Sequence, residues 1–559
     1  MKVHSYAGGV TNRQVARLLG FVLLAVPALL AACDSGIEGT AAGNLPPETE
    51  LAVQVADLTE VLDPDQRFTS LVEVNWSGTD PDGFVEAYEI RFYDESETGT
   101  IGAEAGWART ASRDSLVLLP IPQGAPVANV AFEVRSIDND GLTDPTPART
   151  VFPVRNSPPT LRLSATEVPP DTTWPAASFA FTADDLDGIA NLEAIEVALN
   201  DTTAGFVRLP AETDFLTLVA SDPRAPESEA RLLLGRGGAP SDVRLPGFLT
   251  DAPNTLYLRA LDAAGFRSET AVYPDPDPEA GETWYAQRVT SPILLVNDFR
   301  TSRNTLVLPY HAAILDEYAG AGAYDEWYLA EPFQSGSSVV LLYSENLPTN
   351  PDPTLRETLR FWDHIYWVSN NATNRTIGNN LTLIANFLDE FFADGGSLFV
   401  NVPIELPSNP EDNLGNGALA VLPLAGLLDF SAGGEFEAYD QDLELESGAR
   451  LTASQPLPGG TALPALQTTR KVDAFSYPVG AGTRSLYTGD LTATLNGEEV
   501  AWPGPATLAS LREDGRVALF AVPLVSDFSG NPFLEGIDED PEAPRDAVKL
   551  MLEALGFPR

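Results

Sequence analysis

Short runs of alternating apolar and polar positions fill residues 48–156, and clusters of turn-forming residues separate one run from the next. Alternation with a period of two is typical of strands that bury one face of a sheet. The segment lacks a convincing helical period, in which apolar residues recur every three to four positions. The pattern therefore predicts an all-β segment built from several short strands.

Two landmarks of this segment recur later in the chain. The sequence NWSGTDPDGFVEAYEIRFYD (75–94) is echoed by FTADDLDGIANLEAIEVALND (181–201), and FEVRSIDNDGLTDP (132–145) is echoed by LYLRALDAAGFRSE (256–269). The first pair is offset by 105 residues and the second by 124, so the second copy has about 19 additional residues. This repeat predicts two tandem copies of one β module, the second of which spans residues 157–288.

A different pattern begins at residue 289. The chain now contains continuous apolar runs, typical of strands buried on both faces of a parallel sheet, at PILLVND (292–298), HIYWVSNN (364–371), SLFVNVPIE (397–405) and RVALFAVPLVSDF (516–528). An apolar stripe at helical spacing precedes the third run and is formed by Ile384, Phe387, Leu388, Phe391 and Phe392. The alternation of buried strands with helices predicts a doubly wound α/β domain over residues 289–559.

The first 33 residues have the pattern of a targeting segment. Three basic residues precede an apolar run over 18–32, which is too short to span a membrane as a helix. The run ends in LAAC, which resembles the lipobox of bacterial lipoproteins, and Cys33 is the only cysteine of the chain. The resemblance implies a signal peptide over 1–32, a lipid on Cys33 that anchors the protein in a membrane of the cell envelope, and a linker over 33–47. An ordinary signal peptide with an incidental cysteine is the alternative.

Acidic residues dominate the composition. The chain carries 80 Asp and Glu against 33 Lys and Arg, a formal net charge of −47, and only three of the basic residues are lysines. Nucleic acid is excluded as a natural partner, because phosphate neutralisation needs clustered Lys and Arg. Such an acid excess indicates adaptation to high salt, where screening removes the self-repulsion. A GC-rich genome that favours Arg explains the scarcity of lysine equally well.

The order of strand, Asp-Gly turn, alternating strand and second Asp-Gly turn resembles fibronectin type III and other immunoglobulin-like sandwiches over residues 48–288. In such a sandwich Trp76 is expected in the core, where it would face Tyr88 and Ile90. The resemblance also places the two Asp-Gly turns at the same end of the sandwich.

Aspartates gather in these two turns of the first module. Asp80, Asp82, Asp138 and Asp140 are expected to converge, with Asp144 close by, and hard oxygen ligands at this density suit calcium. The alternative is that Asp-Pro-Asp-Gly and Asn-Asp-Gly are simply good turn formers. The second module keeps fewer aspartates at the matching positions, namely Asp184, Asp185, Asp187 and Asp262.

The C-terminal segment resembles the class I glutamine amidotransferase-like fold over about residues 289–559. The resemblance depends on a helix that ends in Gly395 and Gly396 before an apolar strand, and on the upstream strand YWVSNN. Active members need a cysteine nucleophile and a histidine, but this segment has no cysteine, and its histidines, His311 and His364, are expected to be structural or surface residues. It also lacks a Gly-x-Ser-x-Gly turn, a phosphate-binding loop and a zinc motif, so no enzyme activity is predicted.

Ligands of doubly wound sheets gather beyond the carboxyl ends of the strands. The polar residues that follow the predicted strands are Asn297, Asp298, Arg300, Ser369, Asn370, Asn371 and Glu405. Their amides, carboxylates and single guanidinium group are suited to hydrogen-bond sugar hydroxyls or a peptide. The alternative is that they are polar loop residues that cap the sheet.

Together these patterns predict a multidomain, lipid-anchored cell-envelope protein with a binding or structural role. Two β-sandwiches would act as a stalk for a catalytically silent amidotransferase-like α/β domain, and no cofactor is expected apart from calcium. The expected partners are the membrane and a glycan, a peptide or another envelope protein. A carboxylate-dependent hydrolase that acts on glycans or peptides is the alternative function, and a subunit of an envelope secretion or glycan-uptake complex is a third.

Overall fold

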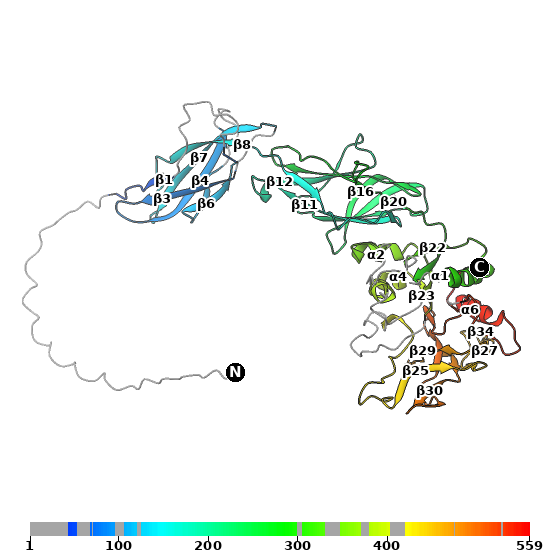
Figure 1. Ribbon diagram of the computed structural model, residues 1–559. Helices are drawn as coiled ribbons and strands as arrows, with labels where there is room; N and C mark the ends of the chain where they lie inside the picture. Colours follow the sequence, from blue (N-terminus) through cyan, green and yellow to red (C-terminus); the bar gives the residue numbers. More distant parts are fainter. Residues whose placement is uncertain are drawn as a thin grey trace, which may run out of the picture.

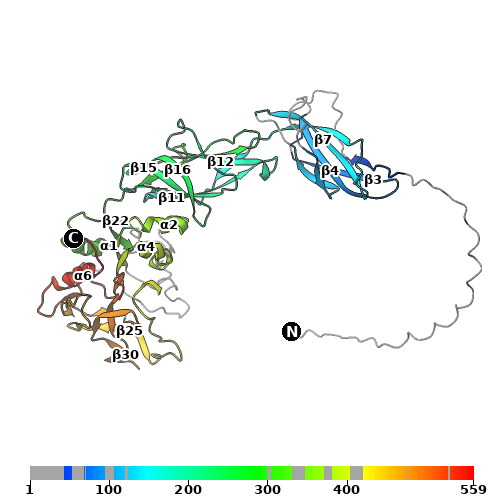
Figure 2. The ribbon, with the colours of Figure 1, turned by 180° about the vertical axis from the view of Figure 1, so that it is seen from behind.

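The computed structural model of the protein describes residues 43–52, 68–69, 71–94, 106–119, 124–298, 304–329, 347–369, 380–402, 420–474, 476–526 and 529–559. The predicted signal peptide, Cys33 and most of the predicted linker lie outside these residues. Two sandwiches are followed by a larger domain that contains the described α-helices (Figure 1, and from behind in Figure 2). Within the described ranges, no helix combines the length and the apolar character that crossing a membrane requires.

The first sandwich consists of a three-stranded and a five-stranded sheet. The smaller sheet has the order β1-β3-β6, with these strands at Glu48–Ala52, Leu71–Thr79 and Asp114–Leu118. The larger sheet has the order β2-β8-β7-β4-β5, with these strands at Phe68–Thr69, Ala148–Arg155, Val127–Asp138, Val85–Asp94 and Ala108–Thr110. Neighbouring strands are antiparallel except for β2 and β8.

Trp76 lies at the centre of the core of the first sandwich. It is 3% exposed, and its ring centroid lies 6.2 Å from that of Tyr88 and 5.9 Å from that of Phe132. Ile90 packs against the same apolar cluster. The prediction of Trp76 as a core residue that faces Tyr88 is therefore confirmed.

The second sandwich repeats this strand order. Strands β9, β11 and β14, at Thr160–Leu163, Ala176–Asp184 and Phe215–Ala220, correspond to β1, β3 and β6. Strands β13, β12, β18 and β19, at Val207–Pro210, Leu192–Leu199, Leu256–Asp262 and Ala271–Tyr273, correspond to β5, β4, β7 and β8. The two sandwiches are therefore copies of one fibronectin type III-like module.

The second copy differs from the first by an added hairpin. Strands β15 and β16, at Glu227–Leu234 and Ala239–Leu249, extend its first sheet beyond β14 and account for the additional residues of the repeat. A separate ribbon has the order β10-β20-β17, with these strands at Thr172–Thr173, Tyr285–Ala286 and Ala252–Pro253.

The last domain is built on a ten-stranded sheet, of which one half is parallel. This half has the order β22-β21-β23-β24-β33, with these strands at Asp325–Tyr328, Ile293–Asp298, His364–Ser369, Ser397–Asn401 and Val517–Phe520. The four predicted apolar runs are thus neighbours in one parallel sheet. Numbered along the chain the order is 2-1-3-4-5, which places a switch point between β21 and β23. The α-helices are α1 (Asn304–Ala319), α2 (Pro351–Leu359), α3 (Asn380–Ile384), α4 (Asp389–Ala393) and α6 (Ala543–Ala554).

The other half of the sheet is antiparallel, so the prediction of a doubly wound parallel domain needs correction: the sheet is mixed. Beyond β33 the order continues with β32, β29, β26, β27 and β34, at Thr507–Arg512, Thr483–Gly489, Arg450–Ala453, Leu466–Thr468 and Leu534–Gly536. A second sheet has the order β28-β25-β30-β31, at Val472–Asp473, Tyr439–Leu445, Thr492–Leu495 and Glu498–Ala501. The described part of the connection from β24 to β33 therefore contains paired strands, where a doubly wound fold would place a helix.

The stretch 384–392, predicted as one helix, is broken into pieces. It contains the end of α3, a 3₁₀ turn at Ala385–Phe387 and the first residues of α4. Ile384, Leu388 and Phe391 are each 1% exposed, so the apolar stripe still faces the core.

The two glycines after α4 are required by the backbone and by packing. Gly395 has a φ of +103°, a region that side chains with a β-carbon rarely adopt. A β-carbon on Gly396 would lie 2.4 Å from the ring of Phe391, which is closer than atoms can approach. These glycines let the chain turn from α4 directly into β24.

Candidate functional site

The carboxyl end of the parallel strands gathers three of the predicted binding residues. Asp298 of β21 lies opposite Ser369 of β23, and the Ser369 hydroxyl donates to the Asp298 backbone oxygen at 3.3 Å. Asn297, Asp298 and Ser369 are 1%, 1% and 4% exposed, so they meet in a buried position. The remaining residues of this prediction lie outside the described ranges: Arg300, Asn370, Asn371 and Glu405. Ligand binding at this edge stays a prediction.

Two asparagines that the sequence analysis did not single out also lie at this edge. Asn380 of α3 donates its Nδ2 to Asp298 Oδ1 at 2.6 Å. Asn401 of β24 donates its Nδ2 to the backbone oxygens of Phe520 and Val522 at 2.8 and 2.9 Å. No local signal marks either asparagine, because their partners lie 82 to 121 positions away in the chain.

Both histidines of the last domain lie beside hydroxyl groups. His311 of α1 is 1% exposed, and its Nδ1 lies 2.9 Å from the Tyr366 hydroxyl. Burial lowers the pKa of His311 to about 3, so its ring is neutral. His364 begins β23, at the end opposite the carboxyl edge, and its Nδ1 lies 2.8 Å from Ser397 Oγ. Both positions agree with the expectation that these histidines are structural.

The Asp-Gly turns of the first sandwich hold the chain segment that enters it. Asn44 donates its Nδ2 to Asp138 Oδ2 at 2.6 Å, and the Leu45 backbone N–H donates to the Asp82 carboxylate at 3.2 Å. The other carboxylate oxygen of Asp138 accepts two backbone N–H groups of its own turn, at 2.8 and 2.9 Å. Asp138 is fully buried, and both of its carboxylate oxygens have hydrogen-bond donors.

The second sandwich holds the preceding linker in the same way. Asn156 donates its Nδ2 to Asp262 Oδ2 at 2.6 Å, and the Ser157 backbone N–H donates to Asp187 Oδ2 at 2.6 Å. Asp187 and Asp262 are the counterparts, in the repeat, of the two aspartates that hold the first segment. We call each arrangement of one Asn side chain, one backbone N–H and two aspartates an aspartate clasp.

A sequence signal for the clasps exists in the linkers, outside the two landmarks of the repeat. The segments NLPP (44–47) and NSPP (156–159) precede the first strand of each module. The asparagine supplies the amide donor, and the two prolines keep the following backbone extended as it enters the sandwich. Comparison of the linkers would therefore have identified both donors from the sequence.

The remaining residues of the calcium prediction lie in the same turns. Asp80 accepts the Asp82 backbone N–H at 3.4 Å, and the Asp140 backbone N–H donates to Asp138 at 2.9 Å. Two of the four predicted ligands, Asp82 and Asp138, are thus engaged by the clasp. Calcium binding by these aspartates stays a prediction.

Within the described ranges, three carboxylates of a different group converge closely enough to hold a metal ion. Oxygen atoms of Glu444, Glu446 and Glu499 lie within 4.8 Å of one another. Lys471 already pairs with this group, since its Nζ contacts Glu444 and lies 3.0 Å from Glu446 Oε1. The lysine therefore supplies a positive charge to these glutamates.

The clasp makes the stability of the first sandwich depend on pH. Burial raises the pKa of Asp138, but the hydrogen bonds from Asn44 and from backbone N–H groups outweigh it, so the pKa lies below its ordinary value. A lowered carboxylate pKa stabilises the folded state above the unfolded pKa, and this contribution is lost as the pH falls through the folded pKa. We expect Asp138→Asn to lower the melting temperature at pH 7, and this difference to shrink below about pH 4.

Scanning calorimetry of the full-length protein from pH 7 to pH 2 measures this difference. Asp114→Asn is the matched control, because Asp114 is an exposed aspartate on β6 of the same sandwich. A difference between wild type and Asp138→Asn that stays constant down to pH 2 would show that the Asp138 charge does not stabilise the clasp.

A further aspartate lies at the junction between the second sandwich and the last domain. Asp325, the first residue of β22, is 7% exposed. Its carboxylate accepts the backbone N–H groups of Thr290 and Ser291, at 3.0 and 3.3 Å, and the Trp362 indole N–H at 2.8 Å. The Thr290 hydroxyl donates to it as well. Because Thr290 and Ser291 connect the two domains, Asp325 fixes the connection to the sheet.

Trp174 of the second sandwich packs into the core of the last domain. Its ring centroid lies 4.7 Å from that of Trp362 and 6.4 Å from that of Trp327, and both pairs are edge to face. Trp174 is 6% exposed and belongs to one apolar cluster with Leu294 and Val296 of β21. The two domains therefore share a continuous core.

Polar contacts add to this interface. Helix α2 lies against the second sandwich (Figure 1). Its residues Thr354 and Glu357 contact the Ser178 hydroxyl and the Arg231 guanidinium group, respectively. Glu357 is 5% exposed, and the Arg231 side chain with which it pairs is 34% exposed. The second sandwich and the last domain thus form one packed unit.

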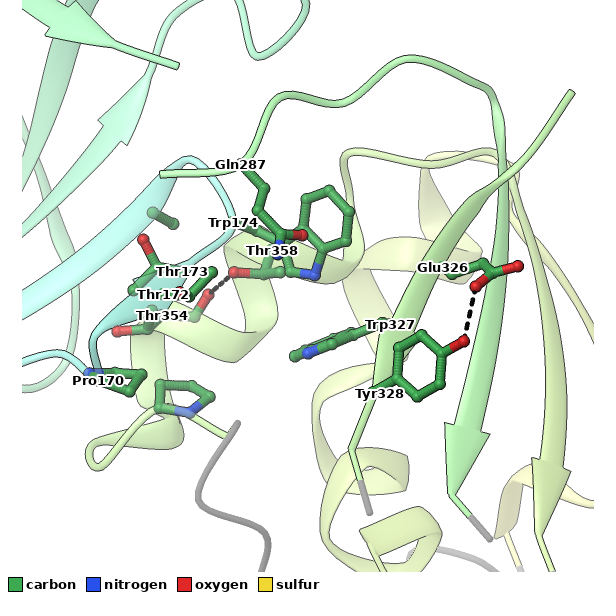
Figure 3. Close-up of a pocket in the computed structure, with 12 residues that line it drawn as sticks. Pro170, Thr172, Thr173, Trp174, Gln287, Glu326, Trp327, Tyr328, Thr354 and Thr358 are labelled. Atoms are coloured by element: carbon green, nitrogen blue, oxygen red, sulfur yellow. Dashed lines mark hydrogen bonds between the residues drawn. The ribbon is translucent and has the colours of Figure 1, made fainter. Parts of the chain in front are cut away.

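A cavity of about 240 Å³ opens at this interface (Figure 3). Its walls come from β10, from Gln287 just after β20, from the edge strand β22 and from α2. The lining includes the side chains of Thr172, Trp174, Gln287, Glu326, Trp327 and Tyr328. None of these residues was predicted from the sequence, because they lie outside the Asp-Gly turns and the carboxyl ends of the predicted strands.

No family model and no curated protein matches the chain. Among solved structures it is similar to the fibronectin(III)-like modules of Clostridium thermocellum CbhA, at 13% identity over 43% of this chain and 94% of that one, with a TM-score of 0.15. Three fibronectin domains of chicken CNTN1 match at 14% identity over 44% and 68%, with a TM-score of 0.16. Bacteroides ovatus SGBP-B, solved with a mixed-linkage heptasaccharide, matches at 13% identity over 46% and 51%, with a TM-score of 0.14. Similarities this low assign no activity, and the strand order described above defines the sandwiches as fibronectin type III-like modules.

Proposed function

We propose that this protein is a lipid-anchored component of the cell envelope that presents its C-terminal domain on a stiff arm of two fibronectin type III-like modules. The aspartate clasp carries this proposal, because the same two hydrogen bonds occur at the entrance of both sandwiches. A linker that is bound to the following module through a side chain and through its backbone has little freedom to bend. The arm would hold the C-terminal domain at a set distance from the lipid on Cys33.

Two further features favour a stiff arm. Pro46–Pro47 and Pro158–Pro159 follow the clasped residues and restrict the backbone to extended conformations. The Gly124 backbone N–H of the first sandwich donates to the Ala264 backbone oxygen of the second at 2.8 Å, which joins the two modules directly.

The C-terminal domain would act by binding and not by catalysis. The strand order 2-1-3-4-5 and the glycine turn before β24 support a relationship to the flavodoxin-like fold of class I glutamine amidotransferases. The antiparallel half of the sheet would be an addition to that fold. The cysteine nucleophile of those enzymes has no counterpart, because Cys33 is the only cysteine of the chain.

The clasp between the sandwiches can be tested by Asn156→Ala in an unlipidated full-length protein that carries Cys33→Ser. Spin labels on cysteines introduced at the exposed positions Ser112 and Thr202 report the distance between the two sandwiches. We expect a narrow distance distribution in the parent protein and a broader one in the variant, because the linker loses its hydrogen bond to Asp262. Pulsed dipolar electron spin resonance measures both.

Asn75→Ala is the matched control, because Asn75 is an exposed asparagine on β3, away from either clasp. This variant should keep the narrow distribution. A parent protein whose distribution is already as broad as that of Asn156→Ala would contradict the stiff arm, whatever the C-terminal domain binds.

A further inference from the structure

The groove between the second sandwich and the last domain contains two indole N–H donors that have no partner among the described residues. The indole nitrogens of Trp174 and Trp327 face the cavity in Figure 3. Neither N–H donates to a residue in the part of the chain that the structure describes. An indole N–H only donates, so a molecule that fills the groove must supply acceptor oxygens at these positions.

Other lining groups can accept as well as donate. The Gln287 amide and the Thr172 hydroxyl make no side-chain hydrogen bond with any described residue. One oxygen of Glu326 accepts the Tyr328 hydroxyl at 2.9 Å, which leaves the other oxygen available as an acceptor. Hydroxyl groups match this mixture best, because each can donate and accept at the same time.

The aromatic side chains give the groove an apolar wall. The large ring of Tyr328 is 44% exposed. The neighbouring Trp327 points into the shared core. A ligand that fits must therefore have an apolar face in addition to its polar groups. An exposed aromatic ring beside convergent polar groups is typical of a binding site.

The charge of the groove restricts the ligand further. Among the described residues that line the cavity, Glu326 is the only charged side chain, and the whole chain has a net charge of −47. An anionic ligand would be repelled, because nothing in this lining compensates its charge. A cation would be attracted by the single carboxylate, but the partial positive charges of the two indole N–H groups would oppose its binding. The groove is therefore best suited to a neutral ligand.

We propose that the groove binds a neutral sugar unit of a glycan, a binding function in addition to presentation by the arm. A sugar ring has hydroxyl groups around its edge and C–H groups on its faces, as the polar groups and the aromatic wall require. The volume of about 240 Å³ is below the roughly 300–1,000 Å³ of pockets for drug-sized ligands. The groove therefore takes one ring, and the rest of the glycan extends into solvent.

Saturation-transfer NMR of the full-length unlipidated protein tests this site with three neutral probes: maltotriose, cellotriose and chitotriose. We expect transfer to at least one of them. Tyr328→Ala and Gln287→Ala should each weaken that affinity about tenfold or more, since one loses the aromatic wall and the other an amide. The melting temperature of each variant shows whether it remains folded.

Matched controls separate the groove from the surrounding surface. Tyr285→Ala removes a tyrosine of similar exposure, 37%, that does not line the cavity, and Gln441→Ala removes an exposed glutamine on β25. Both control variants should bind the trisaccharide with the same affinity as the wild type. Failure of all three trisaccharides to bind at millimolar concentration would overturn the proposal. Equal binding by every variant would overturn it too, and so would binding of triglycine in place of the sugars.

Discussion

Trp174→Ala is expected to uncouple the second sandwich from the last domain. Trp174 is 6% exposed, and its ring lies 4.7 Å from that of Trp362 across the boundary between the two domains. Replacement of a buried tryptophan by alanine typically costs about 3–5 kcal/mol, because lost contacts and a cavity both destabilise the fold. Since this cavity would form at the boundary, calorimetry should show one shared unfolding transition in the wild type and two separate transitions in the variant.

Trp107→Ala is the control for this prediction. Trp107 belongs to the first sandwich, where the guanidinium groups of Arg91 and Arg135 lie 4.3 and 4.2 Å from its ring centroid. Loss of the Trp107 side chain should lower the temperature of the unfolding transition of the first sandwich only. If Trp174→Ala still unfolds the second sandwich and the last domain together, the shared core is not what couples them.

Asp325→Ala is expected to destabilise the same junction by about 3 kcal/mol or more. The variant removes the acceptor of the Thr290 and Ser291 backbone N–H groups, of the Thr290 hydroxyl and of the Trp362 indole N–H. Each buried donor left without an acceptor costs about 1–3 kcal/mol. Urea denaturation followed by tryptophan fluorescence measures the free energy of unfolding.

Asp325→Asn is the comparison that isolates the hydrogen bonds. The amide keeps the size of the side chain and one acceptor oxygen, but its NH₂ group cannot accept from Trp362 or from Ser291. We expect its loss of stability to lie between zero and that of Asp325→Ala. Equal stability of wild type and Asp325→Ala would show that this carboxylate does not hold the junction.

Predictions from the sequence were most successful where a short-range pattern of apolar residues determines the structure. The four apolar runs of the last domain became neighbouring parallel strands, and Trp76 occupies the core of the first sandwich. Both depend on short-range patterns, since a strand buried on both faces must be apolar throughout. The antiparallel strands between 439 and 512 were missed, because each is short and its pairing depends on partners elsewhere in the chain.

The candidate sites were predicted less completely. Asn297, Asp298 and Ser369 lie together because the register of parallel strands aligns their carboxyl ends. Their burial depends on other segments of the fold, among them α3, whose Asn380 donates to Asp298. The position of a residue at the end of a strand can be predicted, but its exposure to solvent is a property of the whole fold.

By itself the sequence determined the tandem repeat, the buried strands and the chemical groups available to the protein, because periodicity and residue type are local properties. The tertiary structure decided what these groups contact. Asp82 and Asp138 bind the entering linker, and Trp174 and Trp327 meet at the groove from different domains. Such contacts join residues far apart in the chain, and their geometry arises only when strand pairing and core packing bring the segments together.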